Sequence, residues 1–150
     1  MKQIYPELSS QHLLFVYGTL RREFNHRLYQ RVLNRYAHYL GEATFRGKLY
    51  DLGSYPGAVD SPHPEDKVVG EVYAVEPEYL STMLDILDEY EGCHPAEPEA
   101  SLYVREQRPV HLGDQQIEAW IYLYNRSVEG REEIPGGDYV AHVRRQDKLI

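Results

Sequence analysis

The chain has 150 residues, enough for one compact domain, and its hydrophobic content of 42% is close to that of ordinary soluble domains. The formal net charge of −8 disfavours binding to nucleic acid, because phosphate backbones are bound by clustered lysine and arginine, and the clusters around Arg21 and Arg144 are short. No stretch approaches the roughly 20 apolar residues of a membrane helix, and no signal-peptide pattern is visible. We therefore expect a cytoplasmic protein without nucleic-acid or membrane partners. The single cysteine, Cys93, fits a reducing compartment.

Residues 13–17 (LLFVY) predict a buried strand, because five apolar or aromatic residues in a row need cover on both faces. The loop Tyr17-Gly18-Thr19-Leu20 at its end carries no charge, and it is a candidate site for a small ligand because a buried strand holds the loop amides rigidly. Residues 23–40 carry apolar side chains at helical spacing and predict a helix.

Residues 47–59 predict a strand followed by a turn, and residues 67–75 predict a further strand, in which Gly70 indicates a bulge or a close backbone approach. The segment 76–92 predicts the clearest helix of the chain, with Pro77 suited to its first turn and Gly92 to its end.

Two more strands are predicted at 101–112 and 116–124, and Gly113-Asp114 between them is typical of an antiparallel hairpin. The tail, residues 131–150, contains a Gly-Gly turn and is expected to end in disorder. Strands outnumber helices without regular alternation, which favours the α+β class: a mostly antiparallel curved sheet or small barrel with helices at its side. We expect a single domain over residues 1–150, and a monomer or weak homodimer.

The predicted helix at 76–92 has a carboxylate on its apolar face. At about 100° per residue, Leu84, Leu87 and Glu91 all fall within about 40° of Leu80. The other acids nearby, Asp85, Asp88 and Glu89, fall on the flank or the opposite face, where acids are normally solvated. A carboxylate near a core and at the negative end of a helix dipole has a raised pKa, as a general acid/base requires. Alternatively, the last turn is frayed and Glu91 reaches water.

Other catalytic patterns are weak. The seven histidines include no metal-like pair at helical spacing, so we expect no metal site. No serine lies in a nucleophile-elbow context, and Cys93 follows the negative end of the helix, which disfavours a thiolate. Alternation within 116–124 places Trp120, Tyr122 and Tyr124 on one face, either as ordinary packing or as the aromatic wall of a ligand pocket.

Six segments in this order, FVYGTLR, GKLYDLGSYPGAV, VVGEVYAV, LDEYEG, YVREQRPV and AWIYLY, resemble the γ-glutamylcyclotransferase superfamily, especially its γ-glutamylamine cyclotransferase-like branch. The resemblance covers about residues 13–139. It implies a small mixed, mostly antiparallel β-barrel with flanking helices. It also implies an enzyme that closes the glutamate of a small γ-glutamyl amide or dipeptide into 5-oxoproline and releases the amine, without a cofactor.

The resemblance also implies roles for individual residues. Glu91, the last acid of LDEYEG, is the implied general acid/base, and the amides around Gly18 are implied to cradle the γ-glutamyl group, which suits an anion nest. The implied substrate-binding residues are Tyr17, Gly18, Thr19, Leu20, Tyr50, Pro56 and Tyr124, with Tyr103 and Arg105 at the pocket mouth.

Two features depart from the family pattern. Glu23 stands where members often carry glycine, and residues 93–101 form a long acidic connection; both are expected to affect specificity. A non-catalytic binding module for a small glutamyl-like or carboxylate ligand is the alternative reading of the same fold. A desolvated carboxyl such as Glu91 favours the enzyme. A module that only binds a carboxylate ligand would gain nothing from a second, desolvated carboxyl group beside that ligand. The sequence leaves open the identity of the leaving amine.

Overall fold

The computed structural model describes residues 12–148. The strands of its 7-stranded sheet are β1 (Leu13–Val16), β2 (Ala37–Asp51), β3 (Pro56–Asp60), β4 (Lys67–Val75), β5 (Tyr103–Leu112), β6 (Gln115–Tyr124) and β7 (Glu132–Glu133). The α-helices are α1 (Asn34–Tyr36), α2 (Leu80–Glu91) and α3 (Tyr139–Lys148). Single 3-10 turns occupy Arg22–Phe24, Pro77–Tyr79, Pro98–Ala100 and Pro135–Gly137, and a π-helical turn occupies Tyr29–Leu33.

Five strands close into a barrel in the order β2-β4-β1-β6-β5, because β5 pairs back onto β2. The β1–β6 pair is parallel, and the other pairs of the barrel are antiparallel. Strands β3 and β7 extend the far end of β2. The predicted α+β class and the small mixed, mostly antiparallel barrel with flanking helices are confirmed.

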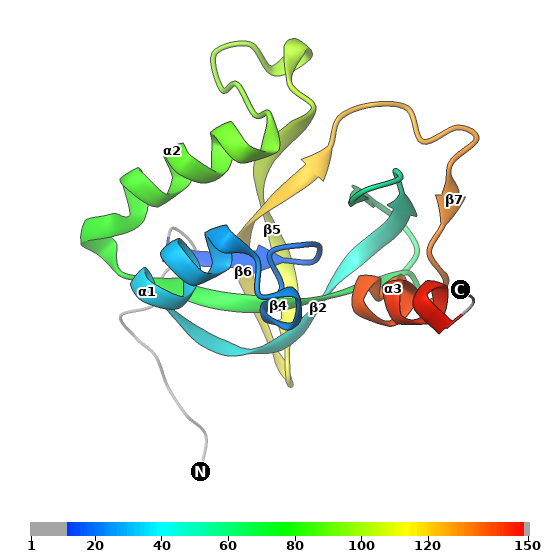
Figure 1. The fold of residues 1–150 in the computed structure, drawn as a ribbon, viewed down its shortest axis with the longest axis horizontal. Coiled ribbons are helices and arrows are strands. Elements are labelled where there is room, and N and C mark those ends of the chain that lie inside the picture. Colours follow the sequence, from blue (N-terminus) through cyan, green and yellow to red (C-terminus); the bar gives the residue numbers. More distant parts are fainter. Residues whose placement is uncertain (1–11, 149–150) are drawn as a thin grey trace.

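Strand β1 is buried on both faces, which explains its uninterrupted apolar run. Leu13 and Phe15 belong to the cluster that fills the barrel. Leu14 and Val16 point the other way and pack in the cluster that joins the barrel to α2 and the segment before α1. Figure 1 places α1 and α2 together at one side of the barrel and α3 with β7 at the other. The two clusters are the two halves of the core.

The helix predicted at 76–92 is confirmed. A 3-10 turn begins at Pro77 and continues into α2, and Gly92 ends the helix in the left-handed conformation with φ of 65°. The predicted hairpin of β5 and β6 is also confirmed, with Gly113 at φ of 60° in its turn. Gly70 makes a close backbone approach as predicted: a Cβ there would lie 2.4 Å from the Val16 carbonyl oxygen.

Two expectations are wrong. The helix expected over residues 23–40 is broken at Asn25, which has φ of 49°, and ends at Tyr36; residues 37–40 instead begin β2, where they pair with β4. Tyr39 lies opposite Tyr73, with ring centroids 5.6 Å apart, so the partner strand overrides the helical spacing. The tail expected to end in disorder forms α3 as far as residue 148, and residues 149–150 lie outside the described part. Within residues 12–148, no helix is long and apolar enough to span a bilayer.

Candidate active site

A cavity of about 470 Å³ opens where β1 ends, beside the last turn of α2. The residues of the loop 17–20, together with Pro56, Glu91 and Tyr103, line it. The structure therefore brings together seven residues that the sequence singled out from four separate segments of the chain. The remaining lining residues are Phe15, Val16, His26, Ser54, Tyr55, Leu87, Tyr90, Leu102 and Tyr122.

Three of the expected site residues lie outside this lining. Tyr50 is in β2, opposite Gly57 of β3. Tyr124 does not line the cavity but packs against Tyr103, which does, with the two rings edge-on and 5.5 Å between centroids. Arg105 points to Asp88, with which it forms a bidentate ion pair at 2.8 and 3.0 Å.

The loop after β1 is a tight turn packed against β3. The Arg21 amide donates to the Gly18 carbonyl at 3.0 Å. A Cβ at Gly18 would lie 3.0 Å from the Pro56 ring, so glycine permits this close packing. Within residues 12–148, the amides of Gly18, Thr19 and Leu20 have no backbone or side-chain acceptor. These three amides are available to a bound anion.

Glu91 is the last residue of α2 and faces the cavity from the helix. Burial raises the pKa of its carboxyl to about 7. No described residue donates a hydrogen bond to this carboxyl, and its position at the negative end of the helix further disfavours the anion. Glu91 is thus half-buried on the apolar face of α2, as expected, and a carboxyl group near neutrality can both accept and donate a proton at physiological pH.

Two tyrosine hydroxyls in the wall are already committed to backbone groups. Tyr17 donates to the Tyr122 carbonyl at 2.6 Å and accepts from the Ala58 amide at 3.2 Å. Tyr103 donates to the Pro56 carbonyl at 2.7 Å. Burial raises the pKa of both phenols well above the ordinary value, so they stay neutral. They fix the wall of the cavity.

His26 and Tyr90, which the sequence did not single out, form a polar chain at the cavity. The His26 Nδ1 accepts from the Leu28 amide at 3.0 Å, so the neutral ring carries its hydrogen on Nε2. That nitrogen lies 3.3 Å from the Tyr90 hydroxyl, which is 3.0 Å from the Thr19 hydroxyl. The signal that could have identified Tyr90 is its place directly before Glu91 in LDEYEG.

Asp88 does not behave as the solvated acid that its place on the helix flank predicted. It is buried because β5 and β6 reach across to it: Arg105 pairs with both carboxyl oxygens, and the Tyr122 hydroxyl donates to Oδ1 at 2.6 Å. Helical periodicity contains no information about partners on distant strands, so the sequence could not indicate this burial.

One group of potential metal ligands occurs in the described residues, and it lies outside the cavity lining. Oxygen or nitrogen atoms of Asp51, Glu132 and His142 lie within 4.8 Å of one another. His142 Nε2 is 2.8 Å from Asp51 Oδ2, so these two residues already form a hydrogen bond that ties α3 to the end of β2.

Comparison with known proteins gives a consistent result. The family model described as gamma-glutamyl cyclotransferase, AIG2-like, matches residues 14–141. A Vibrio cholerae protein with the provisional name gamma-glutamylcyclotransferase is 37% identical over 136 residues, 89% of this chain and 99% of that protein. A Niallia circulans protein named gamma-L-glutamyl-butirosin B gamma-glutamyl cyclotransferase is 35% identical over 120 residues, 75% of this chain and 67% of that protein.

Solved structures repeat the fold. The solution structure of ytfP from Escherichia coli has a TM-score of 0.59 and 28% identity, and the match covers 87% of this chain and 98% of that one. YkqA from Bacillus subtilis has a TM-score of 0.66 and 23% identity over 91% of this chain. The match covers 42% of YkqA, so this chain spans less than half of that protein.

Proposed function

This chain belongs to the gamma-glutamyl cyclotransferase, AIG2-like family, and we propose that it cyclises the glutamyl part of a small γ-glutamyl amine. The products are 5-oxoproline and the free amine. One observation carries the proposal: Glu91, whose pKa burial raises to about 7, lines the same cavity as the loop whose three amides have no acceptor among the described residues. A proton-transfer group and an anion-binding loop are the two parts that this reaction needs.

In the proposed reaction, the amides of Gly18, Thr19 and Leu20 bind the γ-glutamyl group through its carboxylate. Glu91 takes a proton from the α-ammonium group. The resulting amine attacks the γ-carbonyl carbon, and a new C–N bond closes the five-membered ring. The tetrahedral intermediate then breaks its bond to the leaving nitrogen, which receives a proton from Glu91, and the ring nitrogen passes its remaining extra proton to the released amine. The reaction is redox-neutral, and the substrate supplies both the nucleophile and the leaving group.

Positioning accounts for much of the proposed rate enhancement. Because nucleophile and electrophile belong to one molecule, holding the glutamyl chain folded removes most of the entropic cost of bringing them together. Pro56 and Tyr103 form a rigid side of the cavity, since the Tyr103 hydroxyl is bonded to the Pro56 carbonyl. Tyr17 completes this side through its bonds to Tyr122 and Ala58. Tyr50, Tyr124 and Arg105 act, in this proposal, only by supporting the wall from behind.

The identity of the leaving amine is a finer proposal. The name of the Niallia circulans relative gives it a γ-L-glutamyl-butirosin B substrate. A Bos taurus protein named gamma-glutamylaminecyclotransferase is 40% identical over 91 residues, 53% of this chain. Both names support γ-glutamyl amines as the substrate class, in which the leaving group is an amine and not an amino acid.

The test is to incubate the purified protein with a mixed panel of γ-glutamyl amines and dipeptides, and to detect 5-oxoproline by mass spectrometry. Equimolar 5-oxoproline and free amine from at least one substrate would support the proposal. If no substrate gives product, while thermal shift reports binding of the same compounds, the proposal fails and a binding module on the same fold takes its place.

A further inference from the structure

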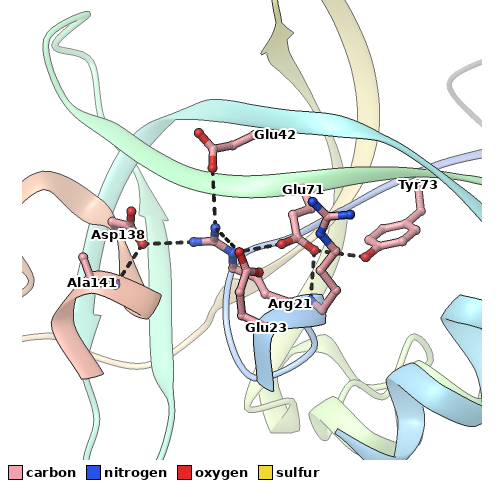
Figure 2. A network of polar contacts seen from close by, with 8 residues as sticks. Arg21, Glu23, Glu42, Glu71, Tyr73, Asp138 and Ala141 are labelled. Atoms are coloured by element: carbon pink, nitrogen blue, oxygen red, sulfur yellow. Dashed lines mark hydrogen bonds and ion pairs between the residues drawn. The ribbon is translucent and has the colours of Figure 1, made fainter. Parts of the chain in front are cut away.

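Arg21, the residue directly after the substrate loop, is a buried cation surrounded by acids. Its side chain is 2% exposed. Its guanidinium nitrogens lie within 4.0 Å of four carboxylates, namely those of Glu23, Glu42, Glu71 and Asp138. Figure 2 shows these side chains converging on the Arg21 guanidinium from four segments of the chain. We call these five residues the Arg21 cluster. None of them lines the cavity.

The cluster fixes the loop from its far end. Glu71 of β4 lies 3.4 Å from Arg21 Nε through one oxygen, and its other oxygen accepts from the Arg22 amide at 3.1 Å. The Tyr73 hydroxyl donates to the same carboxylate at 3.0 Å and orients it. The Arg21 amide closes the turn onto the Gly18 carbonyl. Side chain and backbone of Arg21 therefore connect the loop to β4.

The cluster also joins the loop to the C-terminal helix. Asp138, just before α3, accepts from Arg21 Nη1 at 3.0 Å and from the Ala141 amide at 3.2 Å through the same oxygen. It is thus both the N-cap of α3 and a partner of Arg21. The Phe24 and Tyr139 rings pack nearby at an angle of 48°, with 5.5 Å between centroids. In Figure 2, α3 approaches the cluster from the side opposite Tyr73.

We propose that Arg21 and Asp138 are positioning residues through which α3 holds the loop Gly18–Leu20 in its substrate-binding conformation. The inference rests on the proposed function, because it assigns that loop to the γ-glutamyl group. A second anchor in the first turn of α3 supports it: the His142–Asp51 hydrogen bond attaches the helix to β2 at 2.8 Å. With α3 attached at both places, the loop has a rigid support.

The choice of variant follows from the charges. Removing Arg21 would leave Glu71, 1% exposed, without its buried counter-ion, and such a change commonly unfolds a protein. Asp138→Asn is milder, because asparagine caps a helix about as well as aspartate but carries no charge for Arg21. Asp60→Asn is the matched control, since Asp60 forms a bidentate pair with Arg108 at 3.0 Å on the surface.

The experiment is NMR amide hydrogen exchange on the full chain, with steady-state kinetics alongside. In Asp138→Asn, we expect exchange of the hydrogen-bonded Arg21, Phe24 and Asn25 amides to accelerate about tenfold, while the Ala141 amide stays protected. We expect KM to rise about fivefold with kcat within about twofold, because substrate binding is weakened before chemistry. Asp60→Asn should change neither.

Unchanged exchange at Arg21, Phe24 and Asn25 in Asp138→Asn would overturn the inference. Equal acceleration at Ala141 would also overturn it, because it would reflect loss of the helix cap rather than of the tie to Arg21. Exchange does not require turnover. Accelerated loop exchange in a protein that makes no 5-oxoproline would therefore leave the coupling between α3 and the loop standing and remove the proposed function.

Discussion

Glu91 occupies a position that is unfavourable for a charged carboxyl. It is half-buried in the cavity, it accepts no hydrogen bond from a described residue, and it ends a helix at the negative pole. Burial raises its pKa from the model-peptide value of 4.5 to about 7. A residue in this position lowers the stability of the fold at neutral pH, and the proposed proton transfers are the function that it would serve.

The first prediction concerns stability. The raised pKa means that the stability associated with neutral Glu91 is present below about pH 4.5 and is lost as pH rises to about 7. Glu91→Gln should therefore be more stable than the wild type at a pH of about 8.5, by up to roughly 3 kcal/mol, and nearly equal at about pH 4.5. Urea denaturation at the two pH values measures this. If the difference in the free energy of unfolding between Glu91→Gln and the wild type were the same at both pH values, the assigned pKa would be contradicted.

The second prediction concerns the pH dependence of catalysis. The proposed base must be ionised in the free enzyme, so log kcat/KM should fall with a slope of one as pH drops below the pKa of about 7. The pH profile of 5-oxoproline formation with a neutral γ-glutamyl amide measures it. An acidic limb near pH 4.5 would indicate a solvated carboxyl and would exclude Glu91 as the desolvated base.

Periodicity was sufficient to place Glu91 on the apolar face of the helix, because a regular helix brings residues 80, 84, 87 and 91 to one face whatever surrounds it. It failed for Asp88, whose burial depends on Arg105 and Tyr122 from strands paired far away in the chain. Alternation placed Trp120, Tyr122 and Tyr124 on one face as a possible aromatic wall, with Tyr124 expected to bind substrate, and of these three Tyr122 alone lines the cavity. Which aromatic side chain reaches a cavity depends on barrel curvature, which the sequence does not reveal.

Among the elements, α2 determines where the Glu91 carboxyl lies. Its apolar face packs through Met83 and Leu87 on the barrel, and Asp88 attaches its last turns to β5 and β6. The helix was predicted because proline and glycine mark both of its ends. The helix expected over 23–40 was only partly present, since pairing with β4 determines the conformation of residues 37–40.

The third prediction tests how α2 is attached. Asp88→Ala leaves the Arg105 guanidinium without its ion pair and the Tyr122 hydroxyl without an acceptor, so the free energy of unfolding should fall by about 3 kcal/mol. Asp85→Ala, one turn away on the exposed face, should change it by less than about 0.5 kcal/mol. Chemical denaturation measures both. Equal losses would mean that Asp88 contributes no more than a surface acid.

The whole molecule is acidic, with a formal net charge of −8, and the part of the cavity lining that residues 12–148 form includes no lysine or arginine. A carboxylate on the leaving group would therefore find no fixed counter-ion there, whereas an ammonium group would be attracted by the negative field of the protein. In the proposed reaction the loop amides bind an anion at the glutamyl end of the substrate. Selectivity among substrates is thus expected to follow the charge of the leaving amine.

The fourth prediction compares two substrates of similar length, γ-glutamyl-1,3-diaminopropane and γ-glutamyl-β-alanine. We expect kcat/KM to favour the diamine by about tenfold at low ionic strength, and the ratio to shrink as salt approaches about 0.5 M, because salt screens the field. Kinetics at two salt concentrations measure the ratio. A preference for the β-alanine derivative would indicate a cationic contact for the leaving group that the described residues do not contain.

The central claim is that the Glu91 carboxyl performs the proton transfers, and the most direct test compares 5-oxoproline turnover by the wild type, Glu91→Gln and Glu89→Gln. Glu89 is two residues away on the exposed face, so its substitution is a matched control. We expect Glu91→Gln to remain folded and to lose at least about 100-fold in kcat, as removal of a general acid/base does, while Glu89→Gln keeps wild-type turnover. Wild-type turnover by Glu91→Gln, or equal losses in both variants, would contradict the assignment of Glu91.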